Sequence, residues 1–425
     1  MKVYVETYGC WLSKGESNIT RTIIEENGGI LVNSIAEADV IVIHTCAVRG
    51  DTERKMLARI KHLAKICEAK NSKLLITGCL VNVRPATLSR IAPSASLIEP
   101  GYLDSIWEVI ISSERKLIVR KYGWERCRLP VYREGICYIV PIQSGCLGNC
   151  AFCIEPIARG KLHSYPPDLI VSEVFKAVRK GAKEIYLTGQ DVICYGLDIN
   201  TSLPELIESI LRKVEGEYFI RIGMLEPGLM ANYIDNILDL MKDERVYKYL
   251  HLPLQAGSNK ILKLMNRKYS VEEYLSIASK ARKCIPDITI ATDIIVGFPG
   301  ETEDDFKETI IALKKIEPDK THIARYTIRP FTAAANMKQV PEPIKKKRSK
   351  VLSKIAAEIA YKRNLRHVGR IERVLINSMG HDSCFIGRTL NYKPVVIPLK
   401  PRLGIGYIGY FKIESATPIY LKTAL

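Results

Sequence analysis

The stretch Gly145–Cys153, GCLGNCAFC, contains three cysteines in the pattern C-x-x-x-C-x-x-C, directly after a β-rich run. Thiolates at Cys146, Cys150 and Cys153 can bind three irons of a 4Fe-4S cube and leave the fourth iron open to a small chelating ligand. Zinc is the alternative, but zinc motifs usually supply four ligands as two close pairs, and no second C-x-x-C pair is present. The spacing therefore favours an iron–sulfur cluster with one open iron.

Strand-like and helical patterns alternate on both sides of this motif. Six strand-like runs occur between residues 136 and 330: ICYIVPIQ, EIYLTG, YFIRIGM, YLHLPLQ, ITIATDIIVG and THIARYTIRP. This alternation predicts a barrel or partial barrel, whose chemistry lies at the carboxyl ends of the strands. The cysteine motif follows the first strand, so we expect a cluster in the barrel mouth.

With Phe152 beside the last cysteine, the motif resembles the signature of the radical S-adenosylmethionine superfamily. The resemblance implies a partial (β/α)6 barrel over residues 136–345, in which S-adenosylmethionine chelates the open iron and is cleaved to a 5′-deoxyadenosyl radical. It also implies cofactor contacts at Phe152 in the cysteine motif, at Thr188, Gly189 and Gln190 in YLTGQD, and at Asp293 and Gly297 in TDIIVGFPGE. Turn and helix-cap roles are the alternative for the glycines and the aspartate.

Four further polar residues end the intervening strands and can line the mouth. They lie in RIGMLEP and HLPLQAGS and are Arg221, Glu226, His251 and Gln255. Buried polar side chains of this kind have a purely structural role, with their hydrogen bonds satisfied within the protein, at least as often.

A second group of cysteines lies in the first 120 residues. KVYVETY, ADVIVIHT and KLLITG each precede a helical pattern, which predicts a parallel α/β domain over residues 1–120. Cys10, Cys46 and Cys79 follow these strands, and the carboxyl ends of parallel strands share one sheet edge, so the three thiols should converge.

The contexts ETYGC, HTC and ITGC resemble the N-terminal domain of the methylthiotransferase family. That resemblance implies an auxiliary 4Fe-4S cluster on Cys10, Cys46 and Cys79, with one iron free to hold the sulfur to be transferred. Three buried cysteines at strand ends are the alternative. The family usually has asparagine where this chain has Ser13 and His44, which leaves the hydrogen bonds around the cluster open.

The other six cysteines stand alone, and we assign them no role because isolated cysteines are usually small buried hydrophobes. They are Cys67, Cys127, Cys137, Cys194, Cys284 and Cys384. No run approaches the ~20 apolar residues that span a bilayer, and the first residues do not form a signal peptide. We therefore expect a cytoplasmic protein without a membrane segment.

The C-terminal part is strongly basic. Residues 341–425 hold 17 basic and 5 acidic side chains, a net charge of +12 out of +17 for the whole chain. After a connector at residues 121–135 and the barrel, a basic helix and short β-runs predict a small antiparallel β-barrel over residues 346–425. GRTLNYKPVVI, at Gly387–Ile397, resembles a TRAM domain, which implies RNA binding.

Within this segment, Tyr392 and Tyr407 can stack on bases or pack inside the barrel. The charge favours a polyanionic partner, although a solvated helix face is the commoner meaning of one charge run.

The resemblance covers essentially the whole chain and implies a radical methylthiotransferase with two 4Fe-4S clusters, S-adenosylmethionine and an electron donor. GCLGNCAFCIEPIARGKLHSY and ETYGCWLSKGES resemble the branch that acts on N6-threonylcarbamoyladenosine at position 37 of tRNA. Isopentenyladenosine in tRNA, or an aspartate of a ribosomal protein, is the alternative target. A non-catalytic, zinc-stabilised RNA-binding protein is the alternative from another class, and such a protein would be colourless.

Overall fold

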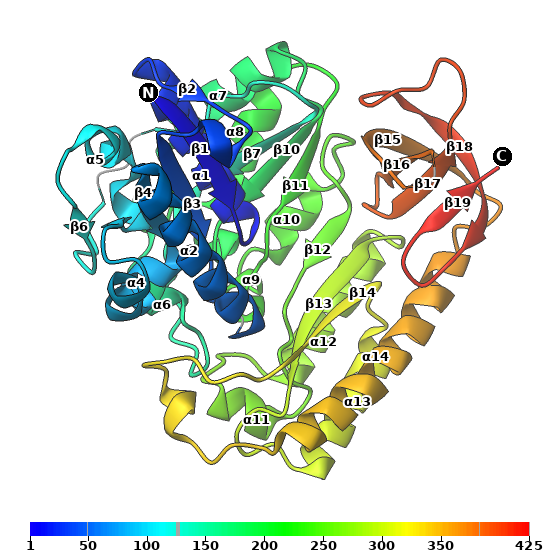
Figure 1. Ribbon diagram of the computed structural model, residues 1–425. Coiled ribbons are helices and arrows are strands. Elements are labelled where there is room, and N and C mark those ends of the chain that lie inside the picture. Colours follow the sequence, from blue (N-terminus) through cyan, green and yellow to red (C-terminus); the bar gives the residue numbers. More distant parts are fainter. Residues whose placement is uncertain (49, 125–127, 382, 425) are drawn as a thin grey trace.

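The computed structural model describes residues 1–48, 50–124, 128–381 and 383–424, which build three main β-structures along the chain (Figure 1). An N-terminal parallel sheet comes first, a curved series of parallel strands follows, and a small closed barrel ends the chain. Helix α14 (Glu342–Leu365) packs along β14 and leads into the closed barrel. The predicted order of fold classes is therefore confirmed.

The N-terminal sheet has six parallel strands in the order β2-β1-β3-β4-β5-β6. Every residue of β3 is buried, because Ile41 and Ile43 share a core with α2 while Val40 and Val42 share another with α1 and α5. The three predicted strands are present as β1, β3 and β4. The elements are β1 (Lys2–Thr7), α1 (Trp11–Glu26), β2 (Ile30–Leu31), η1 (Ile35–Glu37), β3 (Val40–Thr45), α2 (Gly50–Lys70), β4 (Lys73–Gly78), α3 (Cys79–Val83), α4 (Pro85–Ile91), β5 (Ser96–Ile98), η2 (Pro100–Ser105), α5 (Ile106–Ile111) and β6 (Leu117–Ile118).

The middle of the chain contains the six predicted barrel strands. They form two parallel sheets, β7-β10-β11 and β12-β13-β14, which isolated parallel bridges such as Met224 to His251 connect in chain order. Among the described residues β7 and β14 are not paired, so the barrel is partial. The strands are β7 (Cys137–Pro141), β10 (Glu184–Thr188), β11 (Phe219–Ile222), β12 (Tyr249–His251), β13 (Thr289–Val296) and β14 (Lys320–Arg325).

Helices and short segments connect these strands and cover the outside of the partial barrel. Their apolar faces join the strands in one large core, in which Tyr165, Tyr195, Tyr218 and Tyr274 are fully buried. The elements are β8 (Gln143–Ser144), α6 (Glu155–Arg159), β9 (His163–Ser164), α7 (Pro167–Arg179), η3 (Val192–Cys194), α8 (Leu203–Lys213), α9 (Pro227–Met230), α10 (Ile234–Leu240), α11 (Asn259–Leu264), α12 (Val271–Cys284), α13 (Glu303–Ile316) and η4 (Ala333–Asn336).

The C-terminal barrel is closed in the order β15-β16-β17-β19-β18. The prediction of a fully antiparallel barrel was wrong at one pair, since β17 and β19 are parallel. Five strands cannot alternate in direction around a closed ring, so at least one neighbouring pair must be parallel. The strands are β15 (Ile371–Met379), β16 (Cys384–Thr389), β17 (Pro394–Pro398), β18 (Ile408–Ala416) and β19 (Leu421–Thr423).

Both outer units pack against the central barrel. Helix α1 lies on β7 so closely that a Cβ added to Gly15 would be 2.6 Å from Cγ of Pro141. The turn between β16 and β17 inserts Tyr392 among Tyr186, Tyr247 and Tyr249, with ring centroids 4.9–6.4 Å apart. This turn therefore covers the end of the barrel opposite the carboxyl ends of its strands.

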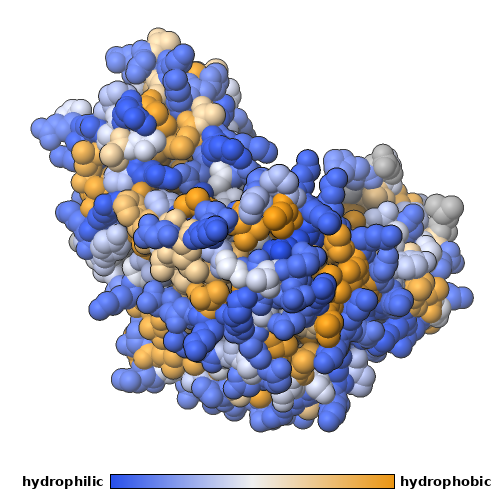
Figure 2. Space-filling model, turned by 90° about the horizontal axis from the view of Figure 1, so that it is seen from below, coloured by the Kyte–Doolittle hydropathy of each residue, from blue (hydrophilic) through white to orange (hydrophobic). Residues whose placement is uncertain are grey.

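The surface carries no large apolar belt in the view of Figure 2, where small hydrophobic patches interrupt a mainly hydrophilic face. Among the described residues, no helix is both long and apolar enough to cross a membrane.

Candidate active site

The first cysteine triad lies in the loop between β8 and α6, at the barrel mouth. The backbone N–H of Gly148 donates to Sγ of Cys146 at 3.2 Å, and Nη1 of Arg267 donates to Sγ of Cys150 at 3.1 Å. Burial raises the pKa of Cys146 to about 12 and that of Cys153 well above the ordinary thiol value. Buried thiols resist ionisation, so a hydrogen-bond donor such as Arg267 is needed to stabilise any thiolate formed here.

The second triad lies at the carboxyl ends of β1, β3 and β4, which are neighbours in the N-terminal sheet. The predicted convergence is present: a Cβ added to Gly9 would be 3.2 Å from Cβ of Cys46, and Cys10 and Cys46 both act on Cys79 electrostatically. Cys10 is exposed, whereas Cys46 and Cys79 are buried. Burial raises the pKa of Cys46 to about 11.

Helix α6 joins the two triads. It begins two residues after Cys153 and ends at Arg159, whose Nε donates to Sγ of Cys79 at 3.2 Å. The Arg159 guanidinium is fully buried and also forms an ion pair with Glu16 of α1. One short helix therefore connects the loop of the first triad to the second triad.

Both triads thus suit anionic metal centres. Each has a buried or half-buried arginine whose N–H donates to a ligand-type sulfur, Arg159 for Cys79 and Arg267 for Cys150. Charge-assisted hydrogen bonds of this kind stabilise a thiolate in a low-dielectric site. The residues present therefore fit iron–sulfur clusters, although sequence reasoning did not identify either arginine.

The residues predicted to contact S-adenosylmethionine lie around this mouth, in different environments. Gln190 donates to Oε2 of Glu155 at 3.4 Å, and Phe152 packs edge-on against Phe298. Gly189 lies against Gln143, where an added Cβ would be 2.7 Å from Cγ, and the Thr188 side chain is buried. Their contacts with S-adenosylmethionine stay predictions.

Gly297 has a local structural role as well. Its φ of +71° is unfavourable for other residues, and an added Cβ would be 2.3 Å from Cγ of Lys345 on α14. This close approach and the turn both require glycine, so Gly297 has the turn role given as the alternative, while its contact with S-adenosylmethionine stays a prediction.

The four mouth residues named from the sequence divide into two groups. Glu226 caps α9 by accepting the Leu229 N–H at 2.8 Å and lies 3.3 Å from Arg267, and Gln255 has a φ of +70°. His251 and Arg221 point into the barrel. Nε2 of His251 lies 2.9 Å from Oδ2 of Asp293, and the His322 ring lies 5.6 Å from the His251 ring.

Several groups of the site carried no sequence signal. Arg267 acts on Cys150 from 117 residues away, and His322 joins His251 and Asp293 in a group whose potential ligand atoms lie within 4.8 Å of one another. Asp191 is buried beside Cys146, and burial raises its pKa to about 7. Of the groups that sequence reasoning missed, only Arg159 lies near a cysteine motif in the sequence.

The two departures from the family pattern have partners here. Oγ of Ser13 lies 3.8 Å from Sγ of Cys10, and Nε2 of buried His44 lies 3.1 Å from Oγ1 of Thr20. Ser13 therefore touches a predicted ligand, while His44 connects β3 to α1.

The cysteines without an assigned role differ in burial. Cys67 and Cys194 are buried, Cys137 and Cys384 are half-buried, and Cys284 is exposed, while Cys127 lies outside the described residues.

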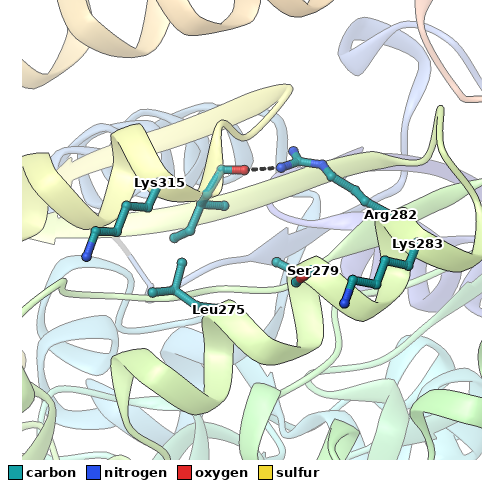
Figure 3. Close-up of a pocket in the computed structure, with 7 residues that line it drawn as sticks. Leu275, Ser279, Arg282, Lys283 and Lys315 are labelled. Carbon is teal, nitrogen blue, oxygen red and sulfur yellow. Dashed lines mark hydrogen bonds between the residues drawn. The ribbon is translucent and has the colours of Figure 1, made fainter.

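One surface pocket of about 420 Å³ lies away from all six predicted ligands, between α12 and α13 (Figure 3). Lys283 and Lys315 border it, and Arg282 donates across it to the Ile316 carbonyl. Its position on the outer helical layer separates it from the barrel mouth.

Three family models match consecutive parts of the chain. A family described as "Uncharacterized protein family UPF0004" matches residues 2–99, the radical SAM superfamily matches residues 140–313, and the TRAM domain matches residues 365–424.

Relatives match over the whole length. The "Probable threonylcarbamoyladenosine tRNA methylthiotransferase" of Pyrococcus horikoshii is 37% identical over 99% of this chain and 98% of its own. The tRNA-2-methylthio-N(6)-dimethylallyladenosine synthase of Thermodesulfovibrio yellowstonii is 36% identical over 93% of this chain and 92% of its own. This chain belongs to the radical S-adenosylmethionine methylthiotransferase family. A more distant methylthiotransferase, the threonylcarbamoyladenosine enzyme of Drosophila melanogaster, is 31% identical over 98% of this chain and 76% of its own.

Membership in the methylthiotransferase family confirms the predicted transferase class and the predicted cofactors, 4Fe-4S clusters and S-adenosylmethionine. Among solved structures, the radical S-adenosylmethionine methyltransferase TsrM from Kitasatospora setae matches with a TM-score of 0.59 over 79% of this chain and 77% of its own. Their sequence identity is 12%, so this match supports the fold alone.

Proposed function

We propose that this methylthiotransferase converts N6-threonylcarbamoyladenosine at position 37 of tRNA to its 2-methylthio derivative. The observation that carries the proposal is the pair of cysteine triads joined by α6 at the mouth of one partial barrel. Relatives named for this nucleoside, in archaea and in an insect, match nearly the whole chain.

In this proposal Cys146, Cys150 and Cys153 hold the cluster that binds S-adenosylmethionine, and Cys10, Cys46 and Cys79 hold the auxiliary cluster. The bound cofactors supply reductive cleavage of S-adenosylmethionine to a carbon radical and a sulfur atom for transfer. Such radical chemistry suits the adenine C2–H bond, which is neither acidic nor electrophilic enough for ordinary acid–base substitution.

The protein's own residues position these groups and balance their charge. Arg267 and Arg159 donate to Cys150 and Cys79, and the Gly148 N–H donates to Cys146. Thr188, Gly189, Gln190, Asp293, Gly297 and Phe152 remain our assignment for the S-adenosylmethionine contacts.

For tRNA docking we propose the exposed basic face of α14 together with the C-terminal barrel. Lys346, Lys347, Lys350 and Lys354 are exposed on α14, and Tyr407 is exposed on the barrel. Basic side chains of this kind position the phosphate backbone. Tyr392 is not part of this face, because it packs into the central barrel.

The division into residues 1–120, 121–135, 136–345 and 346–425 is also our proposal, as are a cytoplasmic location, docking at the anticodon region and an electron donor that reduces the clusters. Isopentenyladenosine remains the second candidate substrate, because the Thermodesulfovibrio yellowstonii relative named for the dimethylallyl nucleoside is 36% identical.

The test is anaerobic incubation of the reconstituted protein with S-adenosylmethionine, a reductant and tRNA that carries threonylcarbamoyladenosine, followed by nucleoside mass spectrometry. A mass gain of one methylthio group supports the proposal. Formation of 5′-deoxyadenosine with an unchanged nucleoside would reject the substrate, and a gain on isopentenyladenosine or a ribosomal-protein aspartate would replace it.

A further inference from the structure

Three cations lie where the C-terminal barrel meets the partial barrel, at a distance from the cysteine loops along the strands. Arg221 lies on β11, Lys320 begins β14, and Arg388 comes from β16 of the C-terminal barrel. Partial burial of the ammonium group, together with the charges of Arg388 and Arg221, lowers the pKa of Lys320. Three elements that are far apart in the sequence therefore bring like charges together.

The two guanidinium groups are held by aromatic rings and keep unused donors. Cζ of Arg221 lies 5.0–5.4 Å from the ring centroids of Tyr186, Tyr249 and Tyr392, and Cζ of Arg388 lies 4.8 Å from that of Tyr392. Nε of Arg221 and Nε of Arg388 are buried without a hydrogen-bond partner. Buried donors of this kind normally have a partner.

The nearby carboxylates compensate the charge of this group only in part. Among the described residues, none of the three cations has a carboxylate oxygen within the 4.0 Å of an ion pair. Asp293 lies between His251 and His322, and Glu184 accepts from Tyr247 at 2.6 Å while burial raises its pKa. The region therefore holds three cationic side chains against the two nearby carboxylates of Asp293 and Glu184.

The His251, Asp293 and His322 group has the composition of a divalent metal site, with two imidazoles and one carboxylate. Lys320 couples electrostatically to Asp293, and Arg221 and Arg388 act on Lys320 in turn. A dication placed beside three positive side chains would be repelled by each of them. The charges in this region favour an anion.

We propose that Arg221, Lys320 and Arg388 form a carboxylate subsite for the threonylcarbamoyl arm of the target adenosine. This inference rests on the proposed function and adds the group that selects the substrate. The arm ends in a carboxylate, whereas an isopentenyl arm is apolar and has no hydrogen-bond acceptor for these donors. Arg388 makes the C-terminal barrel part of the substrate site.

Access to the subsite is along the open edge of the barrel. Lys320 is exposed on the edge strand β14, and the Asp293 and His251 side chains above it are 31% and 17% exposed. An arm that enters from the mouth can therefore reach Lys320 before it reaches the buried Arg221.

The test compares two anticodon stem-loop RNAs, one with threonylcarbamoyladenosine and one in which the threonine carboxylate is a neutral carboxamide. Binding to the cluster-loaded protein is measured by fluorescence anisotropy, and kcat/KM for methylthiolation is measured in parallel. We expect the wild type to prefer the carboxylate RNA about tenfold to a hundredfold in both readouts, as a charge-assisted contact predicts.

Lys320→Met and Arg388→Met should each remove most of this preference by weakening the carboxylate RNA alone. Lys180→Met is the matched control, since Lys180 is exposed at the end of α7, and it should keep the preference. Two substitutions on different β-structures protect the test against one variant that fails to fold.

Equal affinity of the wild type for the two RNAs, or equal loss for both RNAs in the variants, would overturn the subsite. So would a stoichiometric divalent metal that is bound by the wild type and lost in Asp293→Asn. If the wild type shows the binding preference but methylthiolates neither RNA, the proposed function fails and the subsite stands.

Discussion

Replacing Arg159 with methionine should weaken the fold and also release the iron bound near Cys79. Arg159 is fully buried, is paired with Glu16 and donates to Sγ of Cys79 at 3.2 Å. Removing one partner of a buried ion pair leaves an unpaired charge and costs about 3–5 kcal/mol. Because Arg159 would also balance the Cys79 thiolate of the proposed auxiliary cluster, the loss should extend to that cluster.

The matched control is Arg348→Met. Arg348 is nearly as buried, pairs with Glu301 at 2.6 Å and lies on α14, away from both triads. Both variants should show lower thermal midpoints of unfolding, by amounts that correspond to a similar loss of stability. Only Arg159→Met should also lower the iron content of reconstituted protein, from about eight atoms per chain to about four.

The assays are differential scanning fluorimetry under nitrogen and iron and sulfide analysis of the same samples. An Arg159→Met protein that is destabilised like Arg348→Met but keeps all its iron would refute the role of Arg159 toward the cluster. Iron loss in both variants would show that iron content follows general stability instead.

Three further outcomes are expected. Cys150→Ala should abolish 5′-deoxyadenosine and methylthio product while leaving tRNA affinity nearly unchanged, and retained cleavage of S-adenosylmethionine would contradict the ligand assignment. Tyr392→Ala should destabilise the protein by about 3–5 kcal/mol, measured by denaturant unfolding, because its ring packs against Tyr247 and Tyr249 in the central barrel. Burial lowers the pKa of Lys248 to about 8 in the folded protein. Above that pH the unfolded chain binds more protons than the folded one, so the free energy of unfolding should rise between about pH 8 and 10. Denaturant unfolding of Lys248→Met at several pH values should lack this rise.

The strands were predictable because their patterns are local. All six barrel strands and the three longer strands of the N-terminal sheet follow from β-rich runs between helical segments, and Cys10, Cys46 and Cys79 followed from the rule that parallel strands share an edge. Strands β2, β5 and β6 have two or three residues each, which is too short to show the alternation of apolar and polar residues typical of a strand.

The partners of the site were not predictable, because they depend on tertiary contacts. Arg267 reaches Cys150 from the segment after α11, and Lys320 meets Arg388 only because the C-terminal barrel docks under the central one. Tyr392 had two stated alternatives, base stacking or packing within its own barrel. Its ring packs between the two units, against residues of its own barrel and in the aromatic cluster of the neighbouring unit.

The docking of the C-terminal barrel changes what its removal would mean. The basic charge and the TRAM resemblance predict an RNA-binding unit, whose loss should weaken tRNA binding and its salt dependence. However, Asn391 donates to the Asp287 carbonyl at 2.5 Å, Lys393 pairs with buried Asp319 at 2.7 Å, and Tyr392 fills the space beneath Arg221. Deleting this unit would expose that aromatic cluster and leave Asp319 with fewer cations. A truncated chain should therefore lose stability and substrate selection together, so loss of tRNA binding by truncation cannot by itself locate the RNA surface.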